Sequence, residues 1–198
     1  MWVIKLGGSL ADSPALKCWL DFITEYGKGK CVIVPGGGVF ADLVRQEQKR
    51  LDFNAKIAHA MALKAMQQMA LMFEGLNRQL IMADSTVKIR AVLQQDEVAV
   101  WSPDITTLDR SCVPNSWDVT SDSLSAWLAS ELGAGQLVLV KSADIPSSNT
   151  LAELADRNIV DKAFCQFFNI NNCEIKIYNR DHLDQFGTFF KQSYSDER

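Results

Sequence analysis

The chain has 198 residues, of which 47% are hydrophobic and 22% are charged, and its formal net charge is −4. This composition indicates a globular protein with a buried core, and the acidic balance argues against non-specific nucleic-acid binding, which needs a basic face. No apolar stretch approaches the ~20 residues of a membrane span, and Lys5 and Gly7 interrupt the apolar start that a signal segment would need. We therefore predict a cytoplasmic protein without membrane or nucleic-acid partners.

The first half of the chain alternates strands and helices. Strands are predicted at 2–6 and 31–35, and helices at 14–26 and 39–50. Ser13 and Pro14 suit the N-cap and the first position of the first helix. Both strands are apolar almost throughout, which is typical of a parallel sheet that helices cover on both faces.

A long helix is predicted at 55–80, because apolar residues recur there at spacings of three or four. This methionine-rich face indicates core packing most simply. A substrate wall or a subunit interface is the alternative. The residues of the face are Ile57, Met61, Ala65, Met69, Met72, Leu76 and Leu80.

The second half continues the alternation without any repeat or break in composition. We expect strands at 98–103, 136–144 and 174–179, a polar loop at 106–122, helices at 121–135, 149–157, 160–168 and 180–190, and a frayed tail from about 191. Gly133 is expected to end the helix that starts at 121. The sequence thus predicts one domain over residues 1–198, with the α/β architecture of a three-layer αβα sandwich around a mostly parallel central sheet.

The chain has five cysteines, and none of them forms a CxxC pair. An odd count without such spacing indicates neither a disulfide framework nor a zinc site. We expect reduced thiols at all five positions. The positions are Cys18, Cys31, Cys112, Cys165 and Cys173.

Glycines follow the first two predicted strands directly, in KLGGSL and in VIVPGGG. Ligands of open α/β sheets bind beyond the carboxyl ends of the strands, and glycine lets the backbone approach a ligand closely. Backbone N–H groups of such turns, next to a helix N-terminus, form a cradle for anions. Neither stretch fits a Walker A or GxGxxG pattern. The two loops therefore predict a phosphate site of another kind, although tight turns alone are the simpler alternative.

Lys5 stands between Ile4 and Leu6 and just before the first glycine pair. A fixed ammonium at the edge of a sheet suits phosphoryl transfer, because charge spreads over the oxygens of the transferred group. An ordinary surface lysine is the alternative. Asp122, in TSD, precedes an apolar helical run and suits a helix cap as well as a site carboxylate.

Together these features resemble the amino acid kinase family, whose fold is shared by acetylglutamate kinase, uridylate kinase, aspartokinase and isopentenyl phosphate kinase. The matching stretches are KLGGSL, VIVPGGG, DVTSDSLSAWLA and LVLVKSAD, in the order of the family and over most of the chain. The resemblance implies ATP and Mg²⁺ as cofactors and a homo-oligomer, with the methionine-rich helix as the candidate interface.

The resemblance also implies a role for each matching residue. Lys5 and Asp122 would be catalytic, with Asp122 orienting the lysines and helping to hold magnesium. Lys162 in VDKAF is the natural second catalytic lysine and Lys141 is another candidate, although Lys162 could equally be a solvated surface lysine. The residues implied to bind nucleotide are Gly7, Gly8, Ser9, Lys141, Ser142 and Asp144. Those implied to bind the acceptor are Gly36, Gly37, Gly38, Trp117, Asp118 and Thr120.

Three aromatic residues have weaker patterns. Trp117 could stack on an aromatic acceptor, or anchor its loop in the core. His59 and His182 have no ligand partners at metal-binding spacing, so we expect surface or structural histidines.

Within the family, SWDVTSDSLSAWLA and VDKAF resemble the methanofuran-biosynthesis kinases, which phosphorylate an aminomethyl-furanyl methyl phosphate to the diphosphate. The sequence therefore predicts an ATP-dependent kinase with a phosphorylated small-molecule acceptor. Two alternatives stay open. One is a non-catalytic member that binds a nucleotide or a phosphorylated ligand, or serves in an assembly, and the other is a kinase of the same fold that acts on a carboxylate.

Overall fold

A computed structural model of the chain describes residues 1–111, 113–145, 150–167 and 173–195. Within these residues one sheet of six strands runs in the order β3-β4-β2-β1-β5-β6, and every neighbouring pair is parallel. The strands are β1 (Trp2–Leu6), β2 (Cys31–Pro35), β3 (Leu80–Ala83), β4 (Val98–Trp101), β5 (Gln136–Lys141) and β6 (Glu174–Asn179). The parallel ladder brings the carboxyl ends of all these strands to one edge of the sheet.

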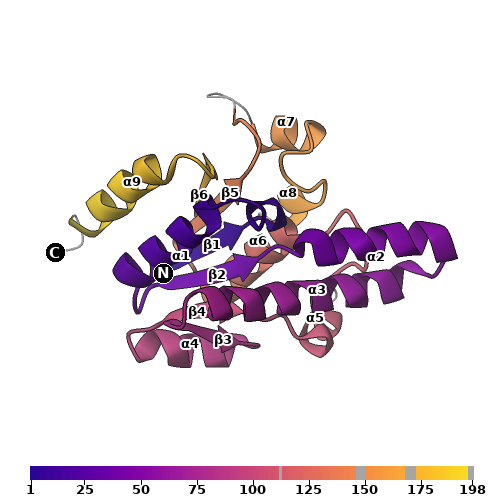
Figure 1. Ribbon diagram of the computed structural model, residues 1–198, viewed down its shortest axis with the longest axis horizontal. Coiled ribbons are helices and arrows are strands. Elements are labelled where there is room, and N and C mark those ends of the chain that lie inside the picture. Colours follow the sequence, from indigo (N-terminus) through magenta and orange to yellow (C-terminus); the bar gives the residue numbers. More distant parts are fainter. Residues whose placement is uncertain (112, 146–149, 168–172, 196–198) are drawn as a thin grey trace.

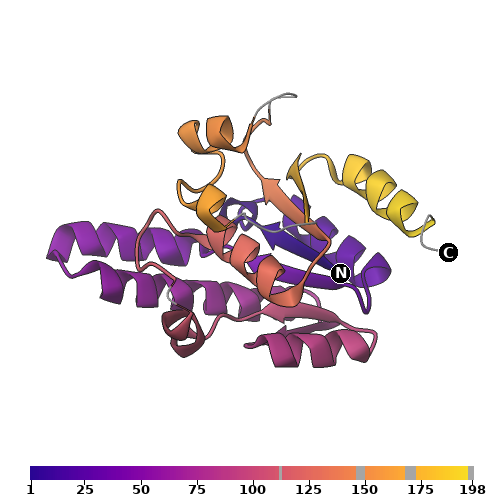
Figure 2. The same cartoon turned by 180° about the vertical axis from the view of Figure 1, so that it is seen from behind.

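Helices lie on both faces of this sheet (Figures 1 and 2). The helices are α1 (Ala15–Tyr26), α2 (Gly38–Leu51), α3 (Ala55–Leu76), α4 (Thr86–Gln94), α5 (Ile105–Arg110), α6 (Ser121–Leu132), α7 (Leu151–Asp156), α8 (Phe164–Phe167) and α9 (Leu183–Ser195), with a 3₁₀ turn η1 (Gly8–Leu10) after β1. The three-layer αβα prediction is confirmed.

The two faces of β1 divide the core, because successive side chains of a strand point to opposite sides. Ile4 and Leu6 pack in the cluster that α1 and α9 cover. Val3 packs in the other cluster, with α4 and α6. The central strand is therefore buried throughout, as its continuous apolar run predicts.

The prediction of one helix over 55–80 is wrong at its end. Asn77 follows the last helical residue, Leu76, in an extended conformation, and its side-chain amide donates to Thr24 at 2.9 Å. Leu80 is therefore fully buried in β3 rather than on a helix. The strand β3 and the helix α4 after it have no counterpart among the predicted elements.

Three further boundaries differ from the prediction. The expected loop at 106–122 contains α5, which starts because the Asp104 carboxylate accepts a hydrogen bond from Thr107 N at 2.8 Å. Lys162 lies in a turn before α8 and not on a helix. The expected fraying from 191 is also wrong in part, since α9 continues to Ser195.

One predicted helix end is confirmed, and a capping box fixes the start of another helix. Gly133 ends α6 in the left-handed region at φ 64°, which glycine adopts without strain. Thr150 and Glu153 form a reciprocal capping box at the start of α7.

The methionine-rich face of α3 is core only in part. Met69 is buried in the cluster on the sheet and Ala65 is buried near Gly37, whereas Ile57, Met61 and Leu76 are exposed. Figure 1 shows α2 and α3 side by side and extending beyond the sheet. The exposed residues therefore lie on a helical pair, as an interface or a substrate wall would require.

The glycine loops after β1 and β2 contact each other through their backbones. A Cβ atom on Gly8 would lie 2.3 Å from the N atom of Gly38, and one on Gly36 would lie 2.3 Å from the N atom of Gly8. Gly36 N also donates to Leu6 O at 2.8 Å. These glycines are therefore required by the packing of one loop on the other, which the sequence reading did not consider.

We predict that Gly36→Ala lowers the free energy of unfolding by about 1–3 kcal/mol, because the methyl group meets rigid backbone rather than a flexible side chain. Gly135→Ala is the matched control, since nothing lies within 4 Å of the added carbon. Chemical denaturation of both variants and the wild type measures the difference. Equal midpoints for Gly36→Ala and Gly135→Ala would contradict the tight loop contact.

Candidate active site

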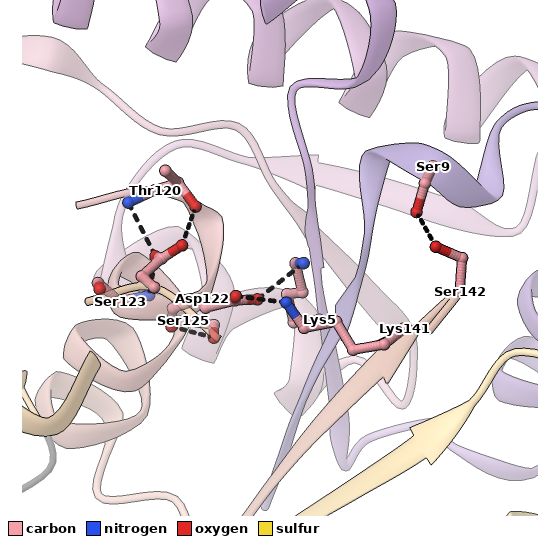
Figure 3. A network of polar contacts seen from close by, with 9 residues as sticks. Lys5, Ser9, Thr120, Asp122, Ser123, Ser125, Lys141 and Ser142 are labelled. Carbon is pink, nitrogen blue, oxygen red and sulfur yellow. Dashed lines mark hydrogen bonds and ion pairs between the residues drawn. The ribbon is translucent and has the colours of Figure 1, made fainter. Parts of the chain in front are cut away.

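A buried carboxylate lies between two lysines at the carboxyl edge of the sheet (Figure 3). Asp122 Oδ1 lies 2.8 Å from Lys5 Nζ, and Asp122 Oδ2 accepts a hydrogen bond from Lys141 Nζ. Lys5 comes from β1 and Lys141 from the neighbouring β5, while Asp122 comes from the first turn of α6. The side chains of Lys5 and Asp122 are only 6% and 3% exposed, so water screens this cluster poorly.

The charges of the cluster shift its proton equilibria. Burial alone would raise the pKa of Asp122, but the nearby charges of Lys5 and Lys141 outweigh it and lower that pKa. Burial, with the charge of Lys5, lowers the pKa of Lys141 to about 8 against the opposing pull of Asp122. Two ammonium groups around one carboxylate leave a net positive charge, which suits an incoming phosphate.

A second carboxylate, Asp161, fixes the start of α6. It accepts hydrogen bonds from Thr120 N at 2.8 Å and Ser123 N at 2.9 Å, and from the Thr120 hydroxyl group. Burial and the charge of Asp122 raise the pKa of Asp161, although these hydrogen bonds oppose the rise. Asp161 thus caps the helix that carries Asp122, across 38 residues of chain. The sequence does not point to Asp161, because Thr120 and Asp122 are themselves residue types that cap helices, whereas in the structure the N-cap residue Thr120 makes no side-chain cap hydrogen bond.

The two candidate second lysines lie in different places. Lys141 reaches Asp122, as described above. Lys162 is exposed in the turn after Asp161 and lines the same cavity as Lys5. The geometry therefore brings Lys141 into the buried cluster and leaves Lys162 at its edge.

The first glycine loop is also tied to the ends of β5 and β6. Ser9 Oγ donates to Ser142 Oγ at 2.9 Å (Figure 3), and Arg180 donates to Ser9 O at 3.2 Å. Asn179 Nδ2 donates to the carbonyl before Asp144, Ala143 O, at 3.1 Å. The nucleotide residues expected from the sequence thus gather at one place, whereas residues 146–149 lie outside the described part.

Two adjoining cavities open beside the cluster. The lysine cavity, of about 400 Å³, is lined by Lys5, Asp122, Lys141, Asp161 and Lys162 among others. The helix cavity, of about 260 Å³, lies between the glycine loops and helices α2, α3 and α6. Arg45, Trp117 and Thr120 line both cavities, so the two are contiguous. The glycines Gly8, Gly37 and Gly38 line the helix cavity.

Trp117 lines both cavities where they meet and is not a core residue. Its indole N–H donates to Gln48 Oε1 at 2.6 Å, and the Arg45 guanidinium lies 4.5 Å from its ring centroid. The expectation that Trp117 anchors its loop in the core is wrong, because the ring packs on α2 and stays partly exposed. Asp118, beside it, is exposed and lines the lysine cavity.

The histidines differ from each other. His182 is exposed, as expected. His59 is buried on α3 and lines the helix cavity, which its isolated position in the sequence did not signal.

The described cysteines Cys18, Cys31, Cys165 and Cys173 are free thiols, and Cys112 lies outside the described residues. Within the described part of the chain, no group of three or more His, Cys, Asp or Glu side chains could hold a metal ion by itself. No helix in the same ranges is long and apolar enough to cross a membrane.

Comparison with known proteins assigns this arrangement to a class. Residues 1–145 match the amino acid kinase family. The chain is 29% identical over 146 residues to the [5-(aminomethyl)furan-3-yl]methyl phosphate kinase of Methanocaldococcus jannaschii, across 73% of this chain and 67% of that protein.

Solved structures share the fold at low identity. Uridylate kinase from Archaeoglobus fulgidus superposes with a TM-score of 0.72 at 14% identity, covering 94% of this chain and 95% of that one. An isopentenyl phosphate kinase superposes with a TM-score of 0.59 at 16% identity, with 91% of each chain covered.

The parallel sheet, the lysine–aspartate–lysine cluster at its carboxyl edge and these relatives together identify the protein as a phosphotransferase. The chain belongs to the amino acid kinase family, and it is a small-molecule kinase within it.

We predict that ATP binding weakens as the pH rises through about 8, because Lys141 loses its proton there and one cation of the lysine cavity disappears. Calorimetric titration at a series of pH values measures the dissociation constant. Lys141→Met should bind ATP more weakly and with a shallower pH dependence, while Lys88→Met, altered at an exposed lysine, should follow the wild type. A wild-type profile that is flat through this range would contradict the assignment.

Proposed function

We propose that the protein transfers the γ-phosphoryl group of ATP to the phosphate of a small acceptor, an aminomethyl-furanyl methyl phosphate, giving a diphosphate. The observation that carries the proposal is Asp122 between Lys5 and Lys141, at the junction of two contiguous cavities. The name of the Methanocaldococcus relative supports the acceptor.

The lysine cavity is the proposed place of the nucleotide phosphates. Its lining includes four cationic side chains, which are those of Lys5, Arg45, Lys141 and Lys162. Ser142 and Asp144, which follow β5, would contact the rest of the nucleotide together with Ser9, which donates to Ser142. Ser9 and Gly8 line the adjoining helix cavity, so they would reach the nucleotide phosphates from that side, with Gly7 next to them. Mg²⁺, which usually binds phosphates and one or two carboxylates, would neutralise phosphate charge there. Asp118, Asp122 and Asp161 are carboxylates of that lining.

Lys5 and Lys141 would act by electrostatics and position, without a covalent intermediate. Asp122 holds both ammonium groups in place, so that they need no reorganisation when charge develops on the transferred group. Lys162, which is exposed and lines the same cavity, would contact the phosphates as a third lysine. Catalysis would come from holding the two phosphates in line and at contact distance.

The helix cavity is the proposed place of the acceptor. Gly37 and Gly38 would present backbone groups to its phosphate, and Thr120 lines the junction with the lysine cavity. Gly36, expected from the sequence to do the same, lines neither cavity and donates its N–H to Leu6 O instead. Arg45, at the same junction, offers a guanidinium that matches a phosphate. Trp117 would place its ring against the body of the acceptor, with Asp118 nearby.

We predict that Lys5→Ala lowers kcat by ~10²-fold or more, because it removes a charge that acts on the transition state. The assay mixes protein, ATP, Mg²⁺ and the furan phosphate, and follows ADP together with the diphosphate product. Lys88→Ala, at an exposed lysine paired with Asp84, is the control and should keep wild-type activity.

Two outcomes of this assay would count against the proposal. Full activity of Lys5→Ala would contradict the proposed mechanism. If the wild type phosphorylates carboxylate acceptors and not phosphate acceptors, the protein is a kinase of this fold with a different acceptor, and the proposed acceptor is wrong. A thermal shift with ATP tests nucleotide binding separately, because a ligand of the native state raises its stability.

We further propose that residues 1–198 act as one domain and that copies of the chain associate in the cytoplasm. Exposed apolar side chains of α2 and α3 support an interface on this helical pair; they are Phe40, Leu43, Ile57 and Met61. Sedimentation equilibrium measures the oligomeric state directly.

A further inference from the structure

His59 is an unusual residue of the helix cavity. It lies on α3, its side chain is buried with 7% exposure, and its Nε2 atom has no hydrogen-bond partner among the described residues. Burial lowers the pKa of His59, so the ring is neutral at neutral pH. Buried polar atoms of proteins are almost always paired, so an unpaired one suggests a partner that is bound only at times.

The surroundings of His59 give it no partner. Besides His59, the α3 and α6 residues that line the cavity are the apolar Ala62, Leu63, Met66 and Leu124 and the polar Ser121. The carboxylate of Asp109 favours positive charge at the ring, and Asp42 and Arg45 are the charged residues that line the same cavity. A ligand at this wall would therefore meet mostly apolar surface and one unpaired imidazole nitrogen, with the carboxylate of Asp109 acting on the ring.

The polarity of the cavity fixes which end of an acceptor lies there. The reacting phosphate must lie at the junction with the lysine cavity, where Lys5 and Arg45 are. The rest of the acceptor must then extend between α2 and α3. An acceptor that fills this space ends against the wall that His59 belongs to.

We infer that His59 recognises the end of the acceptor distant from its phosphate, and that this end carries a hydrogen-bond donor, a primary ammonium, on a flat apolar body. This inference rests on the proposed function, and it names the residue that selects the acceptor. When the imidazole proton is on Nδ1, the Nε2 lone pair accepts a hydrogen bond from the ammonium group of the acceptor. The carboxylate of Asp109 favours the positive charge of that ammonium group. A phosphate ester without the donor leaves Nε2 unpaired and binds less well.

The test compares two acceptors that differ in one group. One is the aminomethyl-furanyl methyl phosphate, and the other has a methyl group in place of the aminomethyl group. The wild type should prefer the amine by at least ~10-fold in kcat/KM, the discrimination of one hydrogen bond. His59→Leu should lose this preference while the KM for ATP stays the same. His59→Gln, whose amide oxygen can accept the same hydrogen bond, should restore part of it.

Met66→Leu is the matched control, because it changes the apolar wall of the same cavity without touching the hydrogen bond. It should keep the preference for the amine. Thermal unfolding shows that the variants are folded, and His59→Leu should be at least as stable as the wild type, because an unpaired polar atom is removed.

Direct binding separates this inference from the proposed function. If neither acceptor is turned over, the proposed reaction fails, and calorimetric titration of the two phosphates still reports the role of His59. Tighter binding of the amine by the wild type, and its loss in His59→Leu, would support the inference. Equal preference in the wild type and His59→Leu, or no binding of either compound, would overturn it.

Discussion

A carboxylate shared by two buried lysines is the constraint around which this molecule is organised. Each lysine enters from a central strand, and neither could stay charged at a buried edge without a counter-charge, because desolvation disfavours isolated ions. Asp122 supplies that charge to Lys5 and Lys141. Its position depends in turn on the start of α6, which Asp161 caps from a distant turn. The loop at Thr120, the helix and the turn at Asp161 are therefore one supporting assembly for the two lysines.

A second constraint is steric. The loops that follow β1 and β2 approach so closely that Gly8 and Gly36 leave no room for a side chain. Gly8 would also present backbone to a ligand, so loop packing and ligand binding both require a residue without a side chain at this position. A loop of larger residues would separate the strand ends and widen the helix cavity that Gly37 and Gly38 line. The glycine-rich sequence thus serves the shape of the cavity as well as its chemistry.

The sequence indicates those features that depend on local pattern. The local pattern predicts the apolar strands at 2–6 and 31–35, the glycines after them and the end of α6 at Gly133. It does not predict features that arise from contacts between residues far apart in the chain. Asn77, where α3 ends, makes a hydrogen bond to the distant Thr24. Strand pairing places Lys141 rather than Lys162 beside Asp122. His59 is buried without any local signal in the sequence. The sequence pattern therefore identifies candidate residues, whereas tertiary packing determines which of them contact each other.

The contiguity of the two cavities has a consequence for the order of events in turnover. Arg45, Trp117 and Thr120 belong to both linings, so no protein wall separates one substrate from the other. Each substrate, once bound, becomes part of the surface that the other one meets. Both must then be present before reaction, and initial-rate plots at several fixed concentrations of either one would intersect rather than run parallel.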